Sequence, residues 1–328
     1  MSEVTRRHCL SMMAVAAVIA APPWVRAAEV WPNRPLRIIT GGAGGVPDIR
    51  ARWLAERLAA AFGQPVVVEN NGAAGGNVGA EQVARSAPDG YTLLLIHQGT
   101  AAVNPHLYAH AGYNPLTDFA PITRFGVGSL LLSVHPSVPA TSVRELIALA
   151  KAKPGALNYG SPGIGTPPHL AAELFKRSAG FEATHVPFKG SGGMMQAMLG
   201  GHVQYCLEGL TAQLPHVRAG SLRALAISGA QRSPALLDVP TIAEAGVPGY
   251  EYVGWTGVAA PAATPRAIVE RLQAEIAKIA ATGEARDWFA SSGAEPGVQS
   301  PQDFAEFIRA DHTRLGKLIR DAGIRIDG

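Results

Sequence analysis

Apolar and polar positions alternate along the chain in a way that is typical of an α/β protein. Short apolar runs at residues 36–40 and 91–96 indicate buried strands, and a stretch of helical period at 49–62 indicates the helix that follows the first of them. Ser142 and Glu145 form a capping box that starts another helix. Further helices are expected over residues 77–87, 101–109, 166–178, 192–199 and 211–218, and further strands over 66–69, 185–188, 202–207 and 222–228.

Two stretches indicate that the chain crosses between two domains. Glycines stand beside apolar, strand-like residues at 125–128 and again at 250–255, and helices that start near 264 and 300 fill the C-terminal part. Two crossings imply a discontinuous first domain. We therefore expect one α/β domain from residues 28–126 and 254–328, and a second from residues 127–253.

Composition excludes several classes of protein. The chain has 328 residues, of which 47% are hydrophobic and 16% are charged, so it can bury a sizeable core and is not a disordered chain. The formal charge is +3, but residues 1–27 hold three arginines and one glutamate, which leaves +1 for the rest. This charge gives no argument for binding nucleic acid or an anionic membrane surface.

The N-terminus has the features of a cleavable export signal. Arg6 and Arg7 form a basic region, an apolar run covers 10–21, and Val25 and Ala27 are small residues suited to a cut after Ala27. The apolar run is shorter than the roughly 20 residues that span a bilayer. The arginine pair fits a twin-arginine signal as well as an ordinary basic region, so both export routes stay open. We expect the mature protein outside the cytoplasm.

A glycine-rich turn joins the first strand to the first helix. A dinucleotide fingerprint would require a third glycine at the position of Pro47. Binding of an anion requires only free backbone amides at a helix N-terminus, which Gly44 and Gly45 can supply. Asp48 is placed to cap the helix, to order the turn or to contact a ligand.

A second turn of the same kind lies more than 100 residues later. Ser161, Gly165 and Thr166 combine hydroxyl groups with backbone amides just before a helix, and Gly190 repeats the arrangement after the next strand.

Two further polar residues stand at the ends of predicted strands. Thr100 stands where open α/β sheets collect ligands, and can give a hydroxyl and an amide to a carboxylate. Glu208 is an unexpected acid for an anion site, unless it holds a hydroxyl, an amine or a water.

Signatures of enzymes and metal sites were not found in the sequence. It has no G-x-S-x-G elbow, no H-E-x-x-H and no P-loop, and once residues 1–27 are removed Cys206 is the single cysteine. We expect no catalytic residues, no metal and no cofactor.

The order of short strings resembles a known family. Residues 31–39, 63–70, 88–94, 104–108, 186–190, 214–220, 248–251 and 255–261 are similar to strings of the extracytoplasmic solute receptors of tripartite tricarboxylate transporters, the Bug or TctC-like proteins. The resemblance runs in order from about residue 31 to the C-terminus. It implies a two-lobed periplasmic binding protein of a type II-like, flytrap architecture, with a hinge of two crossing strands.

The resemblance also implies a function. A receptor of this family captures a small carboxylate between its lobes and delivers it to membrane subunits of the transporter, with no chemistry of its own. By position, the ligand residues would be Gly44, Gly45, Asp48, Thr100, Ser161, Gly165, Thr166, Gly190 and Glu208. The family expectation is a periplasmic monomer. Two alternatives stay open: a receptor of the same fold that signals through a sensor partner, and an exported α/β enzyme.

The chain departs from the family pattern at the first turn. The family often has a proline and an aromatic residue before its first glycine pair, where this chain has Thr40, Gly41 and Gly42. The turn therefore loses an aromatic wall, and the identity of the ligand stays open.

Overall fold

A computed structural model of the protein describes residues 31–321. The chain divides into two units, Met1–Asn33 and Arg34–Gly328, and the description below concerns the second. The expected signal peptide at residues 1–27 lies outside the described residues. Among those that are described, no helix has the length and apolar character needed to cross a membrane.

The strands of the described residues form one sheet of the order β2-β1-β3-β9-β4-β7-β5-β6, in which β8 and β10 also pair with β4. The strands are β1 (Leu36–Thr40), β2 (Val66–Asn70), β3 (Thr92–His97), β4 (Phe119–Val134), β5 (Asn158–Ser161), β6 (Thr184–Pro187), β7 (Tyr205–Gly209), β8 (Arg223–Ile227), β9 (Val253–Pro261) and β10 (Ala294–Pro296). Pairing is parallel within β2-β1-β3 and β7-β5-β6, and antiparallel where β9 and β4 take part.

Helices connect most of these strands, as expected of an α/β fold. They are α1 (Val46–Phe62), α2 (Asn77–Ala84), α3 (Asn104–Leu107), α4 (Val143–Ala152), α5 (Pro167–Ala179), α6 (Ser191–Leu199), α7 (Leu210–Arg218), α8 (Arg266–Ala280), α9 (Gly283–Ser291) and α10 (Pro301–Asp321). Short helical turns are η1 (Ala73–Gly76), η2 (Gly99–Val103) and η3 (Pro234–Leu236).

Most elements expected from the pattern are present, with ends that differ by a few residues. Ser142 caps α4, because its side chain accepts a hydrogen bond from the amide of Glu145. The helix expected over 101–109 is different. A π-helical turn and the four residues of α3 take its place, and the chain is extended again at Tyr108. The pattern did not indicate that β4 would be one strand of 16 residues, and it missed α9 and β10.

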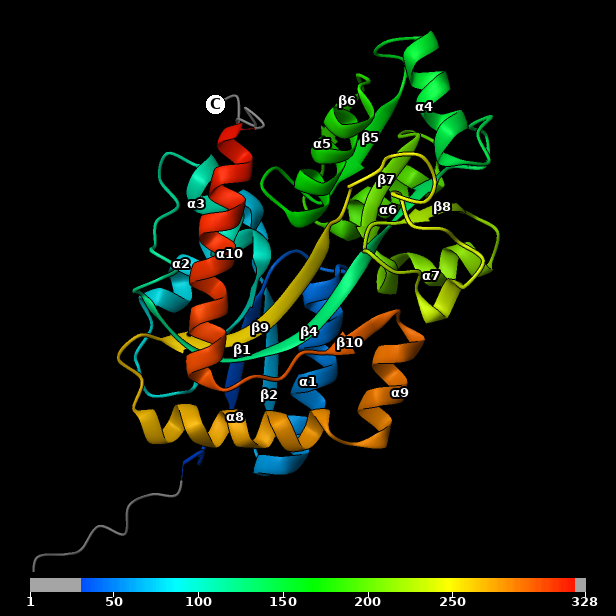
Figure 1. Ribbon diagram of the computed structural model, residues 1–328. Helices are drawn as coiled ribbons and strands as arrows, with labels where there is room; N and C mark the ends of the chain where they lie inside the picture. Colours follow the sequence, from blue (N-terminus) through cyan, green and yellow to red (C-terminus); the bar gives the residue numbers. More distant parts are fainter. Residues whose placement is uncertain (1–30, 322–328) are drawn as a thin grey trace, which may run out of the picture. The chain divides into compact units, whose positions relative to one another are not determined.

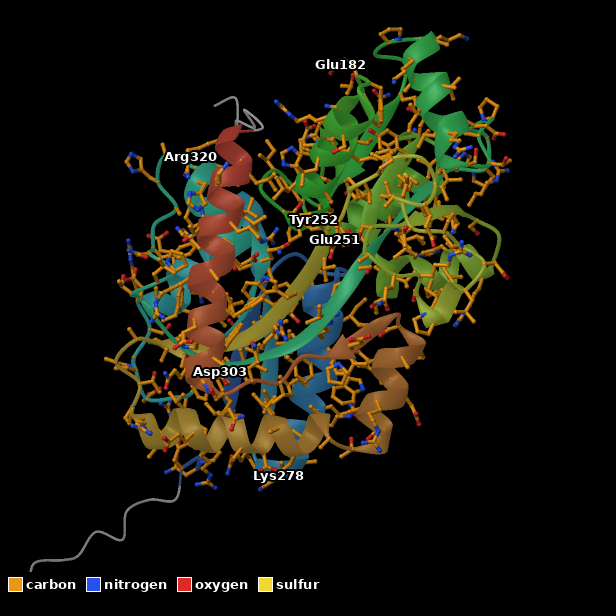
Figure 2. The ribbon with its side chains drawn as sticks, viewed as in Figure 1. Glu182, Glu251, Tyr252, Lys278, Asp303 and Arg320 are labelled. Atoms are coloured by element: carbon orange, nitrogen blue, oxygen red, sulfur yellow. The ribbon has the colours of Figure 1, made fainter. Side chains whose placement is uncertain are left out.

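The long strand β4 passes through both halves of the sheet. Its first part pairs with β9, from Phe119 to Ser129, and its last part pairs with β7, from Leu130 to Val134. Figure 1 shows β4 and β9 running side by side. Figure 2 labels Glu251 and Tyr252 just before β9 begins, where the chain returns from the β8 side of the sheet.

Apolar side chains fill the space between the sheet and its helices. One cluster packs Trp255 of β9 against Phe304 and Ile308 of α10. Another buries Tyr159 and Phe175. Burial of apolar surface is the main stabilising term in such a fold.

Candidate functional site

A cavity opens where the N-termini of four helices converge. Its empty space, part of which is open solvent, amounts to about 810 Å³. The residues at these N-termini that line it are Gly45, Val46 and Pro47 at α1, Thr166, Pro167 and Pro168 at α5, Gly190 and Ser191 at α6, and Gly209, Leu210 and Thr211 at α7. Each helix directs the positive end of its dipole and its first amides toward its N-terminus. The cavity therefore suits an anion.

The first glycine turn offers free donors to this cavity. Gly42 and Gly45 both line it, and among the described residues their backbone amides have no hydrogen-bond partner. The amide of Gly44 is occupied, because it donates to Oδ2 of Asp48 at 2.9 Å. Gly44 and Asp48 do not line the cavity.

Asp48 orders the turn instead of capping α1. The cap position is held by Gly45 and receives no side-chain hydrogen bond. The buried carboxylate of Asp48 accepts from Arg52 Nε at 3.0 Å and from Asn70 Nδ2 at 2.8 Å, in addition to the Gly44 amide. These bonds hold the backbone just before the helix, so Asp48 supports the shape of the turn.

The second glycine turn satisfies most of its own polar groups. The hydroxyl of Ser161 donates to the carbonyl of Gly163 at 3.1 Å, and lies 2.7 Å from Nε2 of His185. The amide of Gly165 donates to Nδ1 of His169 at 3.2 Å. Ser161 is fully buried, and neither it nor Gly165 lines the cavity.

Thr166 is the part of this turn that reaches the cavity. Its hydroxyl donates to the carbonyl of Gly163 at 2.7 Å and retains its capacity to accept. The next two residues, Pro167 and Pro168, have no amide hydrogen. The N-terminus of α5 therefore offers fewer hydrogen-bond donors than a helix start without prolines would.

Gly190 brings the third turn against the first. Its amide donates to the carbonyl of Pro162 at 2.9 Å, and the amide of Gly192 donates to the carbonyl of Ala43 at 3.2 Å. A side chain on Gly42 would place its Cβ 2.7 Å from the Cα of Gly190. Glycine is required here by close approach of the two backbones.

Thr100 lies outside the cavity lining. It is buried, and its hydroxyl donates to the carbonyl of His97 at 3.0 Å. His97 itself lines the cavity, and burial lowers its pKa to about 4, so the ring is neutral. Because the amide of Gly99 donates to Nδ1 at 3.1 Å, the ring proton resides on Nε2. The ring thus holds a neutral donor.

Glu208 is a buried acid in the cavity wall. Its two oxygens accept from the Ser191 hydroxyl at 2.9 Å and from the Gly209 amide at 2.7 Å. Burial raises its pKa to about 7, although both hydrogen bonds favour the charged form. Glu208 is therefore largely neutral below neutral pH, and then it does not repel an anion.

Arg50 lines the same cavity and was missed from the sequence. It precedes Trp53 and Leu54 by three and four positions, so it lies on the buried face of α1. A charged residue on the apolar face of a helix was the available signal. Burial lowers its pKa to about 10, which leaves it charged at neutral pH.

Comparison with known families identifies one that covers most of the chain. The family described as "Tripartite tricarboxylate transporter family receptor" matches residues 50–324. Among curated proteins, the chain is 36% identical to Protein BugT of Bordetella pertussis over 312 residues, which is 94% of this chain and 95% of that protein.

Solved structures of similar proteins include two with named ligands. R. palustris Rpa4515 with adipate is 40% identical, with a TM-score of 0.88, and the match covers 90% of this chain and 99% of that chain. MatC from Rhodopseudomonas palustris with bound malate is 31% identical, with a TM-score of 0.83, and the match covers 88% of this chain and 99% of that chain. Periplasmic binding protein BugD is 31% identical, with a TM-score of 0.86, and the match covers 90% of this chain and 99% of that chain.

Proposed function

Because the chain belongs to the receptor family of tripartite tricarboxylate transporters, we propose that it captures a small carboxylate in the cavity and delivers it to a membrane transporter of that type. The resemblance read from the sequence is confirmed, as is the two-lobed α/β fold of periplasmic binding proteins. Members of the family are binding receptors and not enzymes.

The observation that carries the proposal is the convergence of four helix N-termini on one cavity. Free amides at Gly42 and Gly45 and the charged side chain of Arg50 add to the positive potential there. Two similar structures contain adipate and malate, which are both dicarboxylates. A small carboxylate fits this surface better than a neutral or cationic ligand does.

The nine expected ligand residues divide into two groups under this proposal. Those in the cavity wall, Gly45, Thr166, Gly190 and Glu208, contact the ligand. Those behind the wall, Gly44, Asp48, Thr100, Ser161 and Gly165, keep the turns in shape through their hydrogen bonds.

The lobes of the receptor are proposed to be residues 28–126 with 254–328, and residues 127–253. The change of partner along β4, from β9 to β7 between Ser129 and Leu130, supports a boundary near this point. The start of β9 at Val253 supports the return crossing. Closure about these two strands would couple ligand binding to docking on the transporter.

The location and partners follow from the family. We propose a periplasmic monomer that is exported by the segment at residues 1–27 and meets the membrane subunits of a tripartite tricarboxylate transporter. The route of export, twin-arginine or general secretory, is left open by this proposal.

A thermal-shift screen tests the ligand class. The mature chain, residues 28–328, is unfolded, refolded to remove retained ligand, and mixed with adipate, malate, butyrate and neutral sugars. A ligand at about 100 times its Kd stabilises the protein by about 2.7 kcal/mol, which raises Tm by a few degrees. A shift with carboxylates only is expected. A shift with sugars only, or with none of the acids in a wider carboxylate panel, would contradict the proposal.

A further inference from the structure

Arg50 of α1 uses one end of its guanidinium group to join two strands. Nη1 donates to the carbonyl of Gly126 in β4 at 2.9 Å and to the hydroxyl of Thr256 in β9 at 2.9 Å. The residue is only 3% exposed. These two bonds hold the side chain in one orientation against the cavity wall.

The other edge of the same group has no partner. Among the described residues, neither Nε nor Nη2 of Arg50 donates a hydrogen bond. Neither nitrogen is among the fully buried, unpaired side-chain atoms of the described residues, so both keep some exposure. Arg50 lines the cavity, and its Nη2 lies beside Gly128, another lining residue. Nε and Nη2 form the side of the guanidinium that binds a carboxylate through two parallel hydrogen bonds.

Arg50 also has no acidic partner. None of the ion pairs formed by the described residues includes it. Two hydrogen bonds and the ring of Phe289, 5.8 Å from the guanidinium carbon, offset only part of the cost of burying this charge without a counter-ion. An anion that enters the cavity removes this cost.

Arg50 and the first glycine turn face different parts of the cavity wall. The guanidinium of Arg50 is held by Gly126 in β4 and Thr256 in β9. A Cβ on Gly45 would instead meet the side chain of Ser191 in α6. A ligand that has a carboxylate at each end of a short carbon chain can meet both regions at once.

We propose that Arg50 binds a second carboxylate of the ligand, and that the receptor thereby selects dicarboxylates over monocarboxylates of the same length. This inference rests on the proposed function and adds to it the residue that binds the second carboxylate of the ligand. The first carboxylate lies at the glycine turns, and the second meets Nε and Nη2 of Arg50.

Matched pairs of acids test the selection in the wild-type protein. Succinate, glutarate and adipate are each compared by calorimetry with the straight-chain monocarboxylate of the same carbon number, using refolded protein. A charge-assisted pair predicts a preference of roughly ten- to hundredfold for at least one dicarboxylate. Equal affinities within every pair would overturn the inference while leaving the proposed function intact. Absence of binding by any acid would overturn both.

Substitution of Arg50 tests the residue itself. Arg50→Gln should abolish the preference, because the dicarboxylate loses the partner of its second carboxylate in addition to the positive potential that both acids lose. Arg50→Lys should show an intermediate preference, since lysine keeps the charge without the planar edge. Arg57→Gln is the matched control: it lies on the same helix, pairs with Glu284 and does not line the cavity.

A purely structural role predicts a different result. If Arg50 served only to join β4 and β9, Arg50→Gln would weaken both acids of a pair by the same factor and lower the Tm of the free protein. That result would overturn the inference. Should Arg50→Gln fail to fold, the wild-type pairs and Arg50→Lys still decide the question.

Discussion

The two glycine turns are similar in sequence and differ in what they offer to a ligand. Both follow a strand and precede a helix that has proline in its first turn. In the first turn, Gly42 and Gly45 line the cavity, and their amides have no partner within the described part of the chain. In the second, Ser161 and Gly165 are bound to groups within their own half of the sheet.

The reason for the difference is the presence of histidines behind the second turn. His169 and His185 stack at 4.2 Å between ring centroids, and burial lowers their pKa values to about 4 and about 3. Neutral rings accept and donate hydrogen bonds, so they occupy Gly165 and Ser161. A glycine-rich turn therefore indicates where a ligand can bind only if nothing nearby takes its donors.

A substitution that separates the first turn from Gly190 should cause the largest loss of ligand affinity. Gly42→Ala puts a methyl carbon 2.7 Å from the Cα of Gly190, so the two turns must move apart and the ligand loses contacts to one of them. Two lost hydrogen bonds to a charged ligand, at about 1.5–3 kcal/mol each, predict a loss of affinity of about 100-fold or more. Calorimetry measures it. Gly283→Ala, which meets only the end of Arg286 at 3.9 Å, is the control, and normal binding by Gly42→Ala would contradict the close approach.

Titration of Glu208 should change affinity by about tenfold per pH unit at most, the limit for one linked proton. The carboxyl is neutral below its pKa of about 7 and becomes charged above it, so affinity for an anion should fall as pH rises from 7 to 8.5. Over this range His97, with a pKa of about 4, stays neutral, and Arg50, with a pKa of about 10, stays positively charged.

Glu208→Gln should flatten this dependence, because the amide stays neutral. The measurement is Kd against pH for both proteins. If the two profiles have the same slope, Glu208 is not the group that titrates.

Removing the carboxylate of Asp48, which orders the first turn, should cause a smaller loss of ligand affinity. Asp48→Ala takes the acceptor from the Gly44 amide and from Asn70, so the free amides are less well ordered before the ligand arrives. We expect a loss of affinity of roughly tenfold or less, comparable to losing one turn-ordering interaction of about 1 kcal/mol. Calorimetry on Asp48→Ala checks this, and a loss as large as that of Gly42→Ala would place Asp48 in contact with the ligand.

The matching change in the second turn should affect binding least. Ser161→Ala leaves the amide of Gly163 and the ring of His185 without a buried partner, which costs about 1–3 kcal/mol of unfolding free energy. Affinity should change by no more than about threefold, since the hydroxyl does not reach the cavity. Urea unfolding and calorimetry measure the two quantities. Unchanged stability with a large loss of affinity would reverse the comparison between the turns.

Local patterns were enough to predict many of the elements. Period-2 and period-3.6 runs predicted most strands and helices, because those patterns arise from neighbouring residues. The segment expected as a helix at 101–109 is helical from Gly99 to Leu107, but it begins as a π-helical turn and ends two residues early. The side chain of Asn104 bonds to Gly75 and Asn77, residues that no local pattern connects to it.

The candidate site was predicted in part for the same reason. Thr166, Gly190 and Glu208 end up in the cavity wall because strand ends and helix starts gather at one edge of a sheet. Arg50 was missed because its importance depends on Gly126 and Thr256, which are 76 and 206 residues away.

The sequence by itself determined the family, the α/β fold and the presence of glycine turns before helices, since all three are recorded in short strings and local periods. Only the tertiary structure decided which donors remain free. Gly45 lines the cavity and its amide has no acceptor among the described residues, while the amide of Gly165 is taken by His169. The physical reason is that a hydrogen-bond donor is available to a ligand only when folding brings no other acceptor to it, and that outcome depends on contacts between distant segments.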